Sequence, residues 1–162
     1  VAKIAPAADF SVKLAIDYDN PAIGEQIFDL DVNSKVFKSE ISRARTFGFL
    51  EEVEALRKAG LALGGSLENA IVVSGDRILN DGGLRFRDEF VRHKVLDCIG
   101  DLYLAGGPVI GCFTGRRIGH AVNNQLLRAV FADRDAWTHT TVEDTRSTPL
   151  ERWIDTPAAA VA

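Results

Sequence analysis

Hydrophobic and polar residues alternate along residues 10–18 and again along residues 26–32, which is the spacing of half-buried β-strands. Short apolar runs bounded by turn residues predict further strands at 70–73, 77–79 and 108–114. Apolar residues recur at helical spacing in four other segments, and these predict helices at 34–44, 50–59, 88–102 and 121–132. Strands and helices therefore follow one another through residue 132.

The predicted helix at 88–102 carries chemistry as well as packing residues. Helical geometry puts Val91, Val95, Cys98, Ile99 and Leu102 on one apolar face. His93, Asp97 and Asp101 stack one turn apart on another face, where a histidine and a carboxylate at i and i+4 can share a divalent ion such as zinc. The alternative is an ordinary surface pair worth a few tenths of a kcal/mol.

Two neighbours bear on that choice. Phe90 and Leu104 lie on the polar stripe, so the helix is apolar on nearly every side and its acidic residues are expected to face a cleft. His120, where a strand becomes a helix, could act as a third ligand, a proton donor or a simple cap. The basic and aromatic segment 42–49 is either a helix end with packing aromatics or a ligand contact.

Composition narrows the class of protein. The chain has 162 residues, 46% of them hydrophobic and 26% charged, as in a globular domain with a substantial core. A net charge of −4 argues against nucleic acid as the main partner. No apolar run is long enough for a transmembrane segment, and no signal-peptide pattern opens the chain. Cys98 and Cys112 are expected to be free thiols, which predicts a reducing, cytoplasmic location.

The candidate metal site is incomplete from composition and spacing alone. A catalytic zinc normally has three protein ligands and an open position for water, and the chain supplies two candidate ligands, His93 and Asp97. No glutamate stands beside a candidate ligand as it does in His-Glu-x-x-His motifs. The chain begins at Val1 and contains no methionine, which fits either removal of an initiator residue or a fragment.

Four stretches together resemble the UDP-3-O-acyl-N-acetylglucosamine deacetylase (LpxC) family, the zinc amidases of lipid A biosynthesis. They are SRARTFGFL at 42–50, GGS at 64–66, LNDGGLRFRDEFVRHKVLDCIGD at 79–101 and GH at 119–120. The resemblance runs from about Phe10 to Asp144 and covers the second half of a family member. It implies an α+β fold, a two-layer α/β sandwich with a small β-α-β-β insert. Residues 1–145 would be the second (C-terminal) domain of a two-domain deacetylase, and 146–162 a tail.

The resemblance also implies roles for individual residues. His93 and Asp97 would be zinc ligands, and Lys94 would meet the substrate and the polarised carbonyl. His120 would protonate the leaving amine or hold the substrate diphosphate, with Asp101 orienting it and favouring its charged form. Thr46 would donate its hydroxyl to the tetrahedral oxyanion.

The same resemblance implies which residues would contact the substrate. Phe47 and Phe49 would pack on the sugar or uridine, and Arg117 would lie near the diphosphate. The segment from Val53 through Ala62, Ser66 and Val72 resembles the family's inserted unit, which forms a hydrophobic passage for the acyl chain.

The family's third ligand histidine and its general-base glutamate belong to the first domain, which this sequence lacks. We therefore expect a zinc-dependent amide hydrolase lineage whose isolated chain is inactive and whose partners are the missing N-terminal domain and UDP-3-O-acyl-N-acetylglucosamine. The alternative is a non-catalytic sugar-nucleotide or partner-binding module derived from that fold.

Overall fold

The structure, a computed structural model, describes residues 1–141 and 158–161. Its main sheet has the strand order β1-β8-β2-β3. The bounds are β1 (Ala2–Ala5), β2 (Ser11–Asp17), β3 (Glu25–Asp31) and β8 (Cys112–Arg116). Strand β8 runs parallel to β2 and antiparallel to β1, and β3 is antiparallel to β2. Alternate residues of β2 (Val12, Leu14 and Ile16) are buried, as the period-2 pattern predicts.

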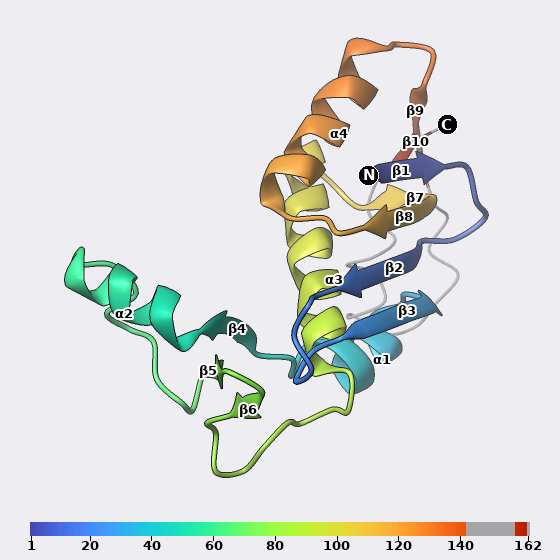
Figure 1. Cartoon of the computed structure of the whole chain (residues 1–162). Coiled ribbons are helices and arrows are strands. Elements are labelled where there is room, and N and C mark those ends of the chain that lie inside the picture. Colours follow the sequence, from blue (N-terminus) through green and yellow to red (C-terminus); the bar gives the residue numbers. More distant parts are fainter. Residues whose placement is uncertain (142–157, 162) are drawn as a thin grey trace.

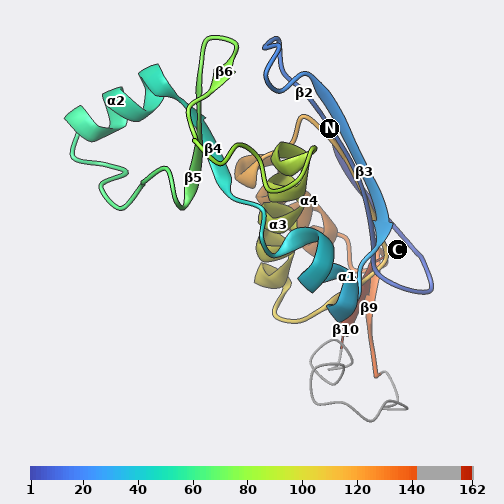
Figure 2. The ribbon, with the colours of Figure 1, turned by 90° about the horizontal axis from the view of Figure 1, so that it is seen from below.

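Two helices cover one face of this sheet (Figures 1 and 2). They are α3 (Glu89–Leu102) and α4 (His120–Ala132). Val91, Val95, Cys98 and Leu102 of α3 are buried against the sheet, whereas the predicted core residue Ile99 is only partly buried. Phe90 was placed on the polar stripe but is fully buried, so the apolar face of α3 is wider than its spacing predicts. The expected two-layer α/β arrangement is confirmed.

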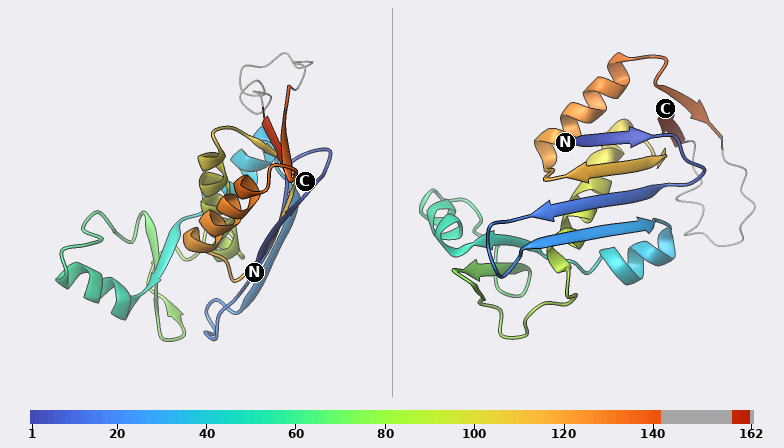
Figure 3. Two further views of the ribbon diagram at one scale, coloured as in Figure 1. Left: turned by 90° about the horizontal axis from the view of Figure 1, so that it is seen from above. Right: turned by 45° about the vertical axis from the view of Figure 1, so that its right-hand side comes forward.

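The expected β-α-β-β insert is present and projects from the body of the molecule (Figures 1 and 3). It consists of β4 (Thr46–Phe49), α2 (Leu50–Lys58), β5 (Ala70–Ser74) and β6 (Arg77–Ile78). These strands form a separate sheet in the order β4-β5-β6. Helix α2 ends as predicted at Gly60, which has φ of +75° and donates to the Arg57 carbonyl while Leu61 donates to that of Leu56.

The helix predicted at 34–44 is shorter and irregular. Asn33 caps it with its side-chain oxygen, but α1 (Ser34–Val36) passes into a π-helical turn at Phe37–Ile41. The Glu40 carbonyl, which would accept the Ala44 N–H in a continued α-helix, instead accepts from Arg92 Nη1 at 2.9 Å. Ala44 donates to Ile41, and the helix ends.

The strand predicted at 108–114 is divided at Gly111. Its first part, β7 (Val109–Ile110), belongs to a small sheet ordered β7-β10-β9, and its second part is β8 of the main sheet. The other members are β9 (Trp137–Thr140) and β10 (Ala158–Val161). Most of the predicted tail at 146–162 lies outside the described residues. None of the helices in the described part of the chain has the length and apolarity that crossing a bilayer requires.

Gly115 in β8 lies where a side chain cannot be added without displacement. A Cβ there would approach Ile118 Cγ2 and Phe113 Cε1 to 2.9 Å each. We expect Gly115→Ala to lower the free energy of unfolding by about 1–3 kcal/mol, because overpacking forces neighbours from their rotamers. Urea denaturation measures this. Gly100→Ala in α3 is the matched control: a Cβ there meets open space, so it should stabilise by about 0.5–1 kcal/mol. Equal behaviour of the two variants would contradict the prediction.

Candidate active site

Helix α3 carries a stripe of polar side chains along one side, with neighbours one turn, or about 6 Å, apart. His93 Nε2 lies 3.2 Å from Asp97 Oδ1, and the two side chains are only 13% and 16% exposed. The predicted convergence of this imidazole and this carboxylate is therefore present in the structure. Lys94, the next residue, places Nζ 3.3 Å from Asp97 Oδ2.

The second nitrogen of His93 determines what the first can do. Nδ1 lies 3.3 Å from the backbone oxygen of Ala44. A carbonyl can only accept, so this contact is a hydrogen bond when Nδ1 carries the proton, and in that neutral tautomer the Nε2 lone pair faces Asp97 Oδ1. Two acceptors at this separation favour a cation between them, either a proton on Nε2 or a metal ion. A backbone carbonyl that holds the distal N–H is also the usual outer-shell partner of a metal-binding histidine.

Asp97 is charged in this setting. Burial alone would raise the pKa of its carboxyl group, but the hydrogen bond and charge of His93 and the nearby Lys94 ammonium together hold the pKa below its ordinary value. An ionised carboxylate is the form that can bind a metal ion.

Aromatic rings pack beside this part of the site. The Phe47 ring packs edge-on against Phe90 at 4.9 Å and against Tyr18 at 5.7 Å between centroids. Lys94 Nζ lies 5.5 Å from the Phe47 centroid, within cation–π range, and the His93 ring lies 6.4 Å away. The predicted substrate residue Phe47 therefore also positions Lys94. Tyr18, which also packs on Phe49, was missed because a tyrosine ending a strand carries no distinctive spacing.

A second polar cluster joins α3 to the first turn of α4. His120 Nδ1 lies 2.9 Å from both carboxylate oxygens of Asp101, as predicted, while its ring is 70% exposed. Asn123, one turn further along α4, is fully buried and donates from Nδ2 to Asp101 Oδ2 at 2.8 Å. Asn123 is not among the residues predicted from the sequence, although its i+3 spacing from His120 could have indicated a shared face. Since Asp101 holds Nδ1, Nε2 is the nitrogen that can exchange a proton with a substrate.

Two other predicted residues lie at exposed positions. Thr46 begins β4, directly after the segment that reaches α3. Arg117 follows β8 in a left-handed backbone conformation, with φ of 51°, and pairs with Asp17. This pairing leaves the guanidinium at the surface.

The residues predicted to line an acyl passage do not share one environment. Val72 is buried in the small sheet and Val53 is half-buried, whereas Ala62 and Ser66 are exposed. The insert also carries large apolar side chains that are exposed and that were not predicted as site residues. These are Leu56, Leu61, Leu63, Leu67 and Leu79.

The described residues bring two candidate metal ligands together. Among residues 1–141 and 158–161, no three His, Cys, Asp or Glu side chains come together as a metal-binding group. His93 and Asp97 supply one nitrogen and one oxygen, both acceptable to zinc. These two side chains could occupy two coordination positions of a metal ion. His120 could donate a proton.

Known proteins resemble this chain over most of its length. The model of the LpxC family, UDP-3-O-acyl N-acetylglycosamine deacetylase, matches residues 1–132. A UDP-3-O-acyl-N-acetylglucosamine deacetylase of Haemophilus influenzae (strain 86-028NP) is 51% identical over 150 residues, which are 91% of this chain and 49% of the relative. One of Pasteurella multocida (strain Pm70) is 50% identical, with the same coverage. The chain thus spans about half the length of these curated relatives.

Proposed function

The chain belongs to the LpxC family of deacetylases, and we propose that it supplies about half of a zinc-dependent active site that deacetylates UDP-3-O-acyl-N-acetylglucosamine in lipid A biosynthesis. The observation that carries this proposal is the convergence of His93 Nε2 and Asp97 Oδ1 at 3.2 Å. Its support is chemical, since an imidazole lone pair and an ionised carboxylate in that arrangement suit a divalent cation.

His93 and Asp97 would hold the zinc ion. When bound, zinc supplies a Lewis acid that polarises the acetyl carbonyl and makes water nucleophilic near neutral pH. Ala44 would keep His93 in the tautomer that presents Nε2, because its carbonyl accepts from Nδ1. Lys94, steadied over Phe47, would place a positive charge beside the reacting carbonyl.

Two further residues would act on charges and protons of the reaction. Thr46 would donate its hydroxyl to the oxygen of the tetrahedral intermediate, a contribution of about 3 kcal/mol in comparable sites. His120 would give a proton from Nε2 to the amine as the carbon–nitrogen bond breaks, or contact the diphosphate. Asp101, itself held by Asn123, would keep the ring oriented for either task.

The substrate would extend from this centre toward the insert and the end of β8. Phe49 and the accessible part of Phe47 would contact the sugar or uridine. Arg117 would meet the diphosphate by exchanging Asp17 for a phosphate oxygen, which a guanidinium binds well. The acyl chain would lie along the insert, where the exposed leucines offer an apolar surface.

Two glutamates on or beside α3 are held by arginines and are not free to act as a general base. Glu89, one turn before His93, is occupied by Arg45 and Arg85, and Glu40 by Arg92. We propose that residues 1–145 act as the second domain of a two-domain, cytoplasmic enzyme. The part of the relatives' length that this chain does not cover would supply a third histidine ligand and the glutamate base. The chain alone is then inactive.

A non-catalytic module that kept the fold is the second candidate, since the described residues hold only two candidate ligands. Zinc titration by calorimetry separates the two. If the chain is half of a deacetylase, it should bind zinc. His93→Ala should then reduce zinc binding below detection, because one of two donors is lost. The control is His139→Ala, which removes an exposed histidine on β9 and should leave zinc binding unchanged. Equal zinc binding by the His93→Ala variant, or no binding by the unaltered chain, would favour the module.

A further inference from the structure

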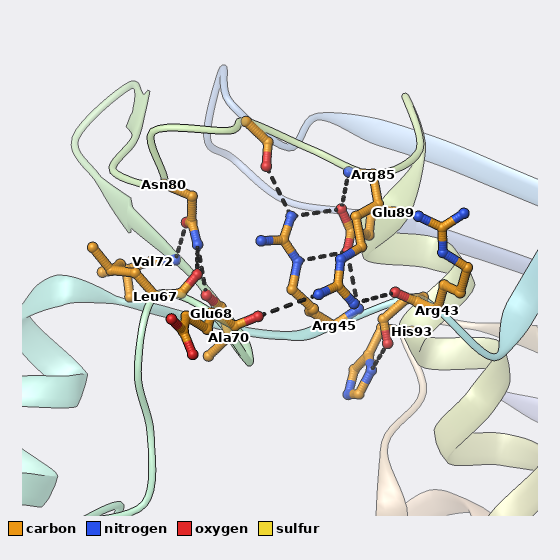
Figure 4. A network of polar contacts seen from close by, with 12 residues as sticks. Arg43, Arg45, Leu67, Glu68, Ala70, Val72, Asn80, Arg85, Glu89 and His93 are labelled. Carbon is orange, nitrogen blue, oxygen red and sulfur yellow. Dashed lines mark hydrogen bonds and ion pairs between the residues drawn. The ribbon is translucent and has the colours of Figure 1, made fainter.

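One peptide unit is attached to α3 at both of its ends. The Ala44 carbonyl oxygen lies 3.3 Å from His93 Nδ1, and the next backbone N–H, that of Arg45, donates to Glu89 Oε1 at 3.0 Å. Glu89 and His93 are four residues apart, so they are neighbours on one side of the helix. The Ala44–Arg45 peptide therefore spans one turn of α3, with Glu89 holding its N–H and His93 its carbonyl (Figure 4).

Glu89 is fully buried, and its carboxylate is saturated with donors. Oε1 accepts from the backbone N–H and from Nε of Arg45, while Oε2 accepts from Arg45 Nη2 and from the backbone N–H of Arg85. The carboxylate also lies at the first turn of α3, where the helix dipole favours a negative charge. A group held in this way has little freedom to move, so whatever it binds is fixed relative to the helix.

The same carboxylate joins the two chain segments that lead into and out of the insert. Arg45 immediately precedes β4, and Arg85 follows β6. Arg45 Nη2 donates to the Gly83 carbonyl, and Arg85 Nη1 reaches the Arg43 carbonyl at 2.9 Å. Figure 4 shows Arg45 and Arg85 meeting at the Glu89 carboxylate. Thr46 and Phe47 are thus anchored to α3 through their neighbour Arg45.

We propose that Glu89 is a positioning residue for His93: by holding the Arg45 N–H it keeps the Ala44 carbonyl on Nδ1, and so fixes the tautomer and orientation of the imidazole. The contacts alone carry the tautomer claim, whereas its consequence for zinc rests on the proposed function. Outer-shell partners of metal-binding histidines commonly change metal affinity about 10- to 100-fold when removed. Glu89 would act indirectly, because it binds the peptide whose carbonyl contacts His93 and does not contact His93 itself.

The test compares the imidazole ¹⁵N resonances of His93 in the whole, metal-free chain and in a Glu89→Leu/Arg45→Leu double variant. Replacing both buried charges with apolar side chains avoids an unpaired ion and favours folding. The N–H of residue 45 nevertheless loses its acceptor. We expect Nδ1 of the unaltered chain to be protonated, as the donor to the Ala44 carbonyl, and the double variant to shift toward the Nε2–H tautomer, whose proton faces Asp97. Equal protonation of Nδ1 in both proteins would overturn the proposal.

Two further variants control for effects that do not depend on the Glu89–Arg45 contact. Asp88→Asn is the matched control, because Asp88 is the adjacent carboxylate and pairs with Arg92 instead of Arg45; it should leave the His93 tautomer unchanged. If the double variant does not unfold cooperatively, Glu89→Asp replaces it, since this change keeps the charge but withdraws the carboxylate by one methylene. Zinc titration of the double variant, or of Glu89→Asp in its place, should show about a tenfold loss of affinity or more, whereas Asp88→Asn should bind zinc as the unaltered chain does. A tautomer change in a chain that binds no zinc would support the positioning role while contradicting the zinc site.

Discussion

Incubation of this chain alone with zinc and UDP-3-O-acyl-N-acetylglucosamine is expected to give no turnover, and addition of the N-terminal half of the Haemophilus influenzae relative is expected to restore it. The reason lies in the donor set: two candidate ligands converge on α3, and no third joins them among the described residues. The nearby Glu89 cannot serve as the base, because Arg45 and Arg85 occupy both of its oxygens. Release of acetate, followed over time, is the measurement.

The complemented mixture also tests the role of His120. His120→Ala should lower the restored rate by about 10²- to 10⁴-fold, the usual contribution of a positioned general acid. His139→Ala should leave the restored rate unchanged. Multiple turnovers by the isolated chain would contradict the proposal that it holds half of the site.

Glu89→Gln should lower the free energy of unfolding by about 3–5 kcal/mol, because the change leaves the Arg45 guanidinium in a buried position without its counter-charge. Arg45 is 9% exposed and Glu89 0% exposed at the side chain, so water cannot replace the lost partner. Urea denaturation at neutral pH gives the difference. The neighbouring Asp88→Asn, which affects a more exposed pair, should cost about 1 kcal/mol or less. Similar losses of stability in the two variants would show that burial does not make the Glu89–Arg45 pair more important than the Asp88–Arg92 pair.

The pH dependence of the same variant has a defined sign. Burial would raise the pKa of Glu89, but hydrogen bonds from Arg45 and Arg85 outweigh it and hold the pKa below the ordinary value of 4.5. The unfolded chain therefore takes up the proton first, and the stabilisation by Glu89 is present above that ordinary value and lost as the pH falls through the lowered folded-state pKa. The stability difference between the unaltered chain and Glu89→Gln should shrink on acidification below about pH 4. A constant difference would contradict the ion-pair account.

Several features of the fold could be predicted because they depend on residues close in sequence. The Schellman end of α2 at Gly60 needs only a residue that tolerates positive φ. The alternation in β2 needs only one buried face. The helix through Ala44 was overestimated because its end is set by Arg92, which lies 52 residues from the Glu40 carbonyl it binds.

The candidate site divides in the same way. His93, Asp97 and Asp101 were found because they share one helix, and Glu89 could have been added by extending the same spacing one turn toward the N-terminus. The sequence shows that Glu89 and Arg45 have opposite charges. Helical spacing does not indicate which of several arginines Glu89 binds. Asn123 was missed for a related reason: a buried amide is recognised by its partner, here Asp101 on another helix.

By itself, the sequence determined that His93 and Asp97 lie together, since helical geometry alone decides which residues are neighbours at i and i+4. Together with the resemblance, it also predicted the two-layer α/β arrangement and the insert. The tertiary structure alone decided which nitrogen of His93 faces Asp97, because that depends on the Ala44 carbonyl, 49 residues away. This contact exists because the segment before the insert packs against α3, where the buried Glu89 carboxylate holds the N–H of Arg45.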